Sequence, residues 1–321
     1  MEGLSQFVAR NDIEGLWEAV RKATRDPREG IFGPSSISWK VNREAALFLG
    51  AGRASLLQLA HPWVATALDQ HSNLRSDPLA RFHNTFRVVF TMIFGTLDQA
   101  LAASRHLYNL HTRIQGNLPQ GVGAHQRGSP YQANEVNALV WVYATLIDSA
   151  LVAYSAVLPA LSEIDRETYY SESRTMGALF GIPATALPAS WSAFEAYIDA
   201  MVRSDVLGVT STSRDMAHRL LHGKGSWVPI PRWYRALTSE WVPERLRGEF
   251  KLEREQEDIK SAARARENMP GTYSHLPPPL RFVGPYREAQ HRLLRKDTDI
   301  LTRLSNRFWM GQTRMMFSEL V

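Results

Sequence analysis

Apolar residues recur along most of this chain at intervals of three and four positions, the spacing of one buried face of an α-helix. In residues 7–24, for example, Ile13, Trp17 and Val20 fall on one face. No run of alternating apolar and polar residues predicts a β-strand. The pattern predicts an all-α fold, with helices over residues 7–24, 38–70, 78–94, 97–115, 135–158, 164–180, 190–203, 239–267 and 286–317.

Glycine and proline mark the predicted breaks between helices, because proline lacks a backbone donor and glycine tolerates the conformations that end a helix. Gly50-Ala-Gly52 and Pro62 interrupt residues 38–70, and Gly95 ends the next predicted helix. Residues 116–132 and 269–285 are rich in glycine or proline, so both are predicted to be loops. The helices before and after these breaks are expected to form a single large domain.

Residues 138–161 form a long apolar stretch in which Asp148 is the single charge. Such a stretch is long enough to span a bilayer, but a carboxylate near its middle is costly in lipid. We therefore expect a helix buried inside a large helical protein. Peripheral membrane contact through this segment is the alternative.

The composition narrows the possible cofactors. The chain has 321 residues, of which 44% are hydrophobic, and it contains no cysteine. Thiolate-ligated haem, iron–sulfur clusters, cysteine-rich zinc sites and covalently attached c-type haem are therefore excluded. Any haem or soft metal must depend on the ten histidines.

The charge of the chain does not indicate a nucleic-acid-binding protein. Lys and Arg exceed Asp and Glu by 37 − 32 = 5, and the two signs are mixed, as in residues 251–260. Residues 1–10 lack the apolar core of a signal peptide. The sequence therefore predicts a cytoplasmic protein that binds no nucleic acid.

His111 is the most informative histidine. It falls late in an apolar predicted helix, with Leu107, Tyr108 and Ile114 at neighbouring positions of the helix surface. A neutral imidazole on such a wall suits an axial haem ligand. A hydrogen-bonded core histidine has the same surroundings, so the spacing alone leaves both interpretations open.

Two further groups of polar residues need partners if they are buried. Arg81, Asn84 and Thr85 lie at i, i+3 and i+4 and share one helix face. A haem propionate or an oxygen-derived ligand would pair with them, and so would backbone carbonyls. Asp148 either orients an imidazole or relays a proton, or it pairs with an arginine in the core.

The segments that carry these candidates resemble, in consistent order, the family of rubber oxygenases (latex clearing proteins) and MpaB-type oxygenases. The resemblance covers about residues 30–205, and the ordered set is more specific than any one motif. The matching segments are Gly50-Ala-Gly-Arg-Ala-Ser-Leu-Leu-Gln-Leu-Ala-His-Pro62, Gln70-His71-Ser72, Arg81-x-x-Asn84-Thr85, Phe94-Gly95, Leu110-His111, Gly116, Tyr131-Gln-Ala133, Leu139 to Ser149, Tyr169-Tyr170, Gly181-Ile-Pro183 and Pro188.

This resemblance implies an all-helical, haem-binding domain with globin-like packing. We place it at residues 30–235, after an N-terminal helical segment (1–29) and before a C-terminal helical extension (236–321). Rubber oxygenases bind b-type haem without a covalent link and use dioxygen to cleave isoprenoid carbon–carbon double bonds. The family's catalytic carboxylate has no match here, although Asp69 and Gln70 lie nearby, so polyisoprene cleavage is not carried over.

The resemblance also assigns roles to the candidate residues. His111 matches the axial iron ligand, and Arg81 and Thr85 match the polar pair on the other side of the haem. Asn84 departs from the rubber oxygenases, which can place a lysine there that closes the sixth position of the iron. Since an amide is a poor iron ligand, water or an open position is expected.

We therefore expect a haem b-dependent oxidoreductase, an oxygenase that takes dioxygen and a small apolar, isoprenoid- or lipid-like substrate. His111 would ligate the iron, Arg81 and Thr85 would be catalytic, and Asn84 and Asp148 would complete the cofactor-binding set. Three alternatives remain. They are a haem- or lipid-binding protein without turnover, a helical scaffold without a cofactor, and a non-haem iron site of two histidines and a carboxylate.

Overall fold

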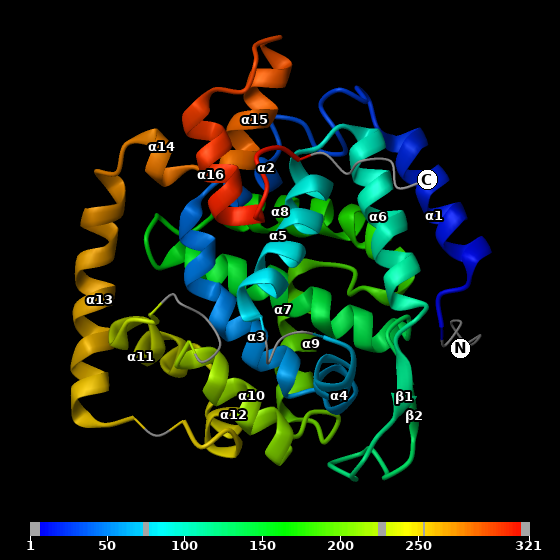
Figure 1. Cartoon of the computed structure of the whole chain (residues 1–321), viewed down its shortest axis with the longest axis vertical. Helices are drawn as coiled ribbons and strands as arrows, with labels where there is room; N and C mark the ends of the chain where they lie inside the picture. The colour runs from blue at the N-terminus through cyan, green and yellow to red at the C-terminus, as the bar shows by residue number, and fades with distance from the viewer. Residues whose placement is uncertain (1–6, 73–76, 224–228, 253, 316–321) are drawn as a thin grey trace.

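The computed structural model describes residues 7–72, 77–223, 229–252 and 254–315, and these form the predicted all-α fold (Figure 1). Two short strands, β1 (Gln115–Asn117) and β2 (Pro130–Gln132), pair antiparallel as a hairpin. The helices are α1 (Arg10–Ala23), α2 (Ile37–Asn42), α3 (Ala51–Leu59), α4 (Pro62–His71), α5 (Pro78–Phe94), α6 (Leu97–His111), α7 (Val136–Ser155), α8 (Glu163–Gly177), α9 (Trp191–Arg203), α10 (Ser211–Leu221), α11 (Arg232–Trp241), α12 (Glu244–Glu249), α13 (Gln256–Ser274), α14 (Pro278–Arg281), α15 (Gly284–Leu293) and α16 (Ile300–Met310), with 3₁₀ turns η1 (Ala45–Gly50), η2 (Ala178–Phe180) and η3 (Ala184–Ala186).

Helix α7 is the central helix of the molecule (Figure 1). Within the described residues it is the one helix long and apolar enough to cross a membrane, and 67% of its apolar stretch is buried inside the protein. Trp141 is fully buried and donates a hydrogen bond from its indole to the Leu57 carbonyl of α3, at 3.0 Å. These contacts support the prediction of a core helix.

The glycine predicted to interrupt the chain lies where η1 meets α7. A Cβ atom at Gly50 would lie 2.4 Å from the Ser149 carbonyl oxygen, so only glycine allows the two backbones to approach this closely. The 3₁₀ turn ends there and α3 begins at Ala51. The second predicted break is also confirmed, because Pro62 is the first residue of α4.

Helices α5 and α6 form an antiparallel pair connected by Gly95 and Thr96. The Asp77 side chain accepts a hydrogen bond from the Ala80 amide at 2.9 Å and caps α5. Thr96 and Gln99 form a capping box at the start of α6. The antiparallel arrangement places the first turns of α5 beside the last turn of α6. This is the part of the fold that positions the candidate site.

Several predicted boundaries are wrong. Helix α6 ends at His111 rather than at residue 115, because residues 115–117 pair with β2 inside the predicted loop. The predicted helix 286–317 is divided into α15 and α16, and Arg295 between them has a positive φ of 56°. Both helices pack on α5, where Arg87 donates to the Met310 carbonyl at 3.0 Å.

The region before α15 also differs from the prediction. Residues 239–267 are not one helix, because Pro243 holds Val242 extended and separates α11 from α12. Conversely, α13 continues through Pro270 to Ser274, inside the predicted loop 269–285. The proline removes one helical hydrogen bond without ending the helix.

Candidate functional site

Arg81 and Thr85 lie one turn apart near the start of α5 and contact each other directly. The Arg81 Nη1 donates to Thr85 Oγ1 at 2.9 Å, and the Thr85 hydroxyl donates to the Arg81 carbonyl at 3.0 Å. Both residues are half-buried, and burial lowers the pKa of the Arg81 guanidinium. Asn84 is exposed instead, so its amide needs no partner inside the protein.

His111 is the last residue of α6, and its imidazole is kept neutral. Burial and, to a smaller extent, the positive charge of Arg81 together lower its pKa to about 4. The guanidinium on α5 therefore acts on the imidazole across the helix pair. No other residue in the described ranges forms a hydrogen bond with the His111 ring, which leaves its nitrogens available.

A hydrogen-bonded group lies next to this site, between α4 and the hairpin that follows His111. The Tyr131 hydroxyl donates to Gln70 Oε1 at 2.7 Å and lies 3.1 Å from His71 Nε2, which also lies 3.1 Å from the Gln115 carbonyl oxygen. Burial and the charge of Asp69 raise the pKa of Tyr131. These residues stabilise the chain immediately after the axial-ligand candidate.

Gln70, His71 and Tyr131 lie in segments that carry the family resemblance, but no role was predicted for them. The signal that could have linked them is Gly116. A Cβ atom there would lie 2.7 Å from the Tyr131 hydroxyl, so the close approach of the tyrosine requires a glycine.

Asp148 is paired with an arginine, which was one of the two alternatives predicted for this residue. Its carboxylate lies 2.6 Å from the Arg53 guanidinium, whose side chain is 8% exposed. Arg53 also donates to Ser149 Oγ and to the Trp241 carbonyl, each at 2.9 Å. Asp148 therefore connects α7 to α3, and its described contacts are those of a structural ion pair.

Two histidines, His61 and His125, lie together at the start of α4, the end opposite His71. His61 and His125 have ring centroids 5.4 Å apart, and Trp63 packs against both. His61 is 4% exposed, and burial lowers its pKa to about 3. Its side chain does not cap α4, contrary to the backbone-capping role that its position before Pro62 suggests.

The donor groups of His111 and Arg81 fit haem better than a bare metal ion. Nowhere in the described ranges do three His, Asp or Glu side chains gather where they could hold an ion. A haem supplies four ring nitrogens and needs a single axial donor from the protein. The neutral, unpartnered imidazole of His111 meets that need, and Arg81 is placed to pair with a carboxylate.

Comparison with known protein families identifies one match. The family model described as "ER-bound oxygenase mpaB/B'/Rubber oxygenase, catalytic domain" matches residues 39–270. This range contains Arg81, Thr85 and His111 and extends from α2 into α13. No curated protein and no solved structure matches the chain.

Proposed function

Because the chain belongs to the mpaB/rubber oxygenase catalytic-domain family over residues 39–270, we propose that it is a haem b-dependent oxygenase with His111 as the axial ligand. The observation that carries this proposal is the neutral imidazole of His111, which faces a cationic side chain and has no hydrogen-bond partner in the described ranges. An imidazole must be unprotonated to donate its lone pair to iron. The substrate class we propose is a small apolar molecule, together with dioxygen.

In this proposal each side chain has a separate task. His111 would hold the iron from the end of α6, and Arg81 would pair with a haem propionate or hydrogen-bond to an oxygen-derived ligand. Thr85 accepts a hydrogen bond from Arg81 and so fixes the direction of the guanidinium. Haem, when bound, supplies the redox chemistry that activates dioxygen. Donors held in place beforehand stabilise negative charge that develops on oxygen.

The structural ion pair gives Asp148 an indirect part in this proposal. By joining α3 to α7 it stabilises two helices that share one hydrophobic core with α5 and α6. Asn84 is exposed, and a side-chain amide is a poor iron ligand. We therefore propose that Asn84 would leave the iron accessible to water or dioxygen.

The test is the absorption spectrum of the full chain purified from haem-replete cells. We expect a Soret band that is lost in His111→Ala. The matched control is His106→Ala, because His106 lies on the same helix but is exposed. A colourless wild-type protein that takes up no added haem would contradict the proposal.

A second measurement separates an oxygenase from a haem or lipid carrier. Oxygen consumption by the haem-loaded protein should rise when an apolar substrate is added and should fall to background in His111→Ala. A protein that keeps its Soret band but consumes no oxygen with any isoprenoid or lipid would be a carrier.

A further inference from the structure

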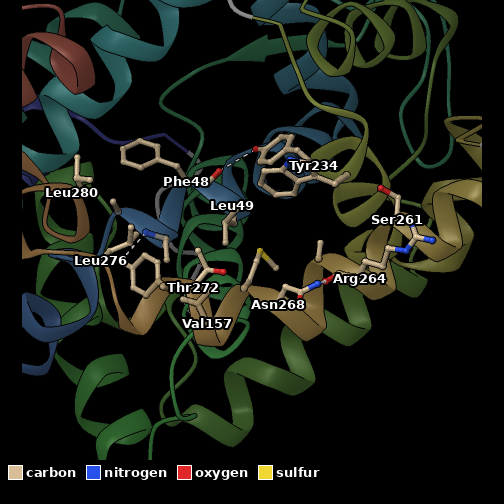
Figure 2. A pocket seen from close by; sticks show the side chains of 16 residues that line it. Phe48, Leu49, Val157, Tyr234, Ser261, Arg264, Asn268, Thr272, Leu276 and Leu280 are labelled. Atoms are coloured by element: carbon tan, nitrogen blue, oxygen red, sulfur yellow. Dashed lines mark hydrogen bonds between the residues drawn. The ribbon is translucent and has the colours of Figure 1, made fainter.

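A groove of about 580 Å³ lies apart from Arg81 and His111, between η1, α11 and α13 (Figure 2). Its volume falls within the range of about 300–1,000 Å³ that small-molecule sites occupy. Most of its lining is apolar, and includes Phe48, Leu49, Val157, Met269, Leu276 and Leu280. The groove could not be predicted from the sequence, because its walls come from segments about 200 residues apart.

The groove is polar at one end and apolar at the other. Figure 2 shows Ser261 and Arg264 together at one end and Leu276 and Leu280 at the opposite end. Leu280 is 65% exposed, so an apolar ligand would shield it from water. The arrangement suits an elongated ligand with one polar head and an apolar chain.

Arg264 is the one charged side chain among the described residues that line the groove. Its guanidinium forms no ion pair or hydrogen bond within the described ranges. Its neighbours are already paired, since Arg254 and Arg266 both contact Glu240, at 2.7 and 3.1 Å. A single free guanidinium matches a singly charged carboxylate in a bidentate pair.

Phe48 connects the groove to the helix that carries the candidate site. It lines the groove from η1, and its ring centroid lies 5.4 Å from that of Phe82 and 4.5 Å from that of Phe86. Phe82 and Phe86 directly follow Arg81 and Thr85 on α5. An apolar chain in the groove would therefore contact Phe48, which packs on the helix that carries Arg81 and Thr85.

We propose that this groove binds an amphiphilic carboxylic acid, with the carboxylate on Arg264 and the apolar chain directed along Phe48 toward Leu276 and Leu280. Only the step that would make this acid the substrate of the oxygenase rests on the proposed function. Binding itself does not depend on haem, so the two proposals can fail separately.

The test uses the purified full chain and the fluorescent fatty acid cis-parinarate, which is displaced by hexadecanoate or by the neutral alcohol hexadecanol. We expect hexadecanoate to bind about fivefold more tightly than the alcohol, because one exposed ion pair contributes about that difference in affinity. Arg264→Leu should remove this preference. Arg266→Leu is the matched control, because it removes the same charge from the same helix outside the groove, and it should keep the preference.

A second variant tests the apolar end. Leu280→Asp places a carboxylate where the chain would lie and should weaken both ligands, and its exposed position protects the fold. Equal binding of acid and alcohol by the wild type, or unchanged binding by Leu280→Asp, would overturn the inference. It would also be overturned if Arg264→Leu reduced only co-sedimentation with phosphatidylglycerol vesicles, because the occupant would then be a membrane. These outcomes stand whatever the Soret band of His111→Ala shows.

Discussion

The carboxylate of Asp148 lies 2.6 Å from the guanidinium of Arg53, and this ion pair joins the two helices at the centre of the fold. Their side chains are 20% and 8% exposed, respectively. Nearby, Gln58 Nε2 donates to Thr145 Oγ1 at 3.0 Å. The polar positions of α7 are therefore matched by polar groups of α3, which fixes how the two helices align.

Replacing Asp148 by asparagine should destabilise the protein, because it leaves the Arg53 charge buried without a counter-charge. We expect a loss of about 3 kcal/mol in the free energy of unfolding, the lower end for one broken partner of a buried pair. Urea denaturation measures it. Asp165→Asn is the control, since Asp165 pairs with Lys40 at a more exposed position, and the change should cost less than about 1 kcal/mol. Equal effects of the two variants would contradict the structural role of Asp148.

His61 should make the folded apoprotein sensitive to acid. Burial, with a smaller effect of His125, lowers its folded pKa to about 3, below the value of about 6.5 in an unfolded chain. Between these pH values the unfolded state binds the extra proton, so stability falls as the pH falls. One group that is protonated only in the unfolded state changes the free energy of unfolding by up to about 1.36 kcal/mol per pH unit.

His61→Gln should therefore reduce the pH dependence of unfolding between about pH 4 and pH 6 by close to one proton. Urea denaturation of the apoprotein at several pH values gives the slope directly. His275→Gln, at an exposed position, is the control and should leave the slope unchanged. A slope that does not change in His61→Gln would show that His61 is protonated in the folded protein.

Thr85→Val tests whether the contact with Arg81 positions the guanidinium. Valine keeps the shape of the side chain but removes the oxygen that accepts from Arg81 Nη1 at 2.9 Å. We expect unchanged haem content and an oxygenase rate lower by about tenfold, since a misplaced group costs this much or more. Thr91→Val is the control on the same helix, because the buried Thr91 hydroxyl has no partner in the described ranges. Equal rates in the two variants would contradict the positioning role.

The sequence predicted the parts of the fold that depend on local signals. Proline at the first turn and a glycine after the last turn bounded α5 correctly, and the apolar length of α7 identified the core helix. The sequence failed where tertiary contacts override local preference. Pro270 lies inside α13, which packs along α11 on one side, and proline alone predicted a loop there.

In the candidate site, too, local signals were predicted from the sequence and tertiary contacts were not. Helix periodicity placed Arg81 and Thr85 on one face, and the structure joins them by two hydrogen bonds. Periodicity could not tell which arginine pairs with Asp148, because Arg53 lies on a helix 95 positions away in the sequence. Periodicity also could not show that Asn84 is exposed, because the burial of a helix face depends on which distant segments pack against it.

Asn84→Lys tests how close this position lies to the iron. Asn84 shares the start of α5 with Arg81 and is exposed, so a longer side chain has room to move. A lysine amine on a flexible stem is a stronger iron donor than an amide. We expect the resting spectrum of the haem-loaded variant to become six-coordinate and cyanide to bind more slowly. Asn84→Gln lengthens the side chain without an amine and should keep the wild-type spectrum. If the spectrum and cyanide binding of Asn84→Lys equal those of the wild type, residue 84 does not reach the iron, and the sixth position is set by other groups.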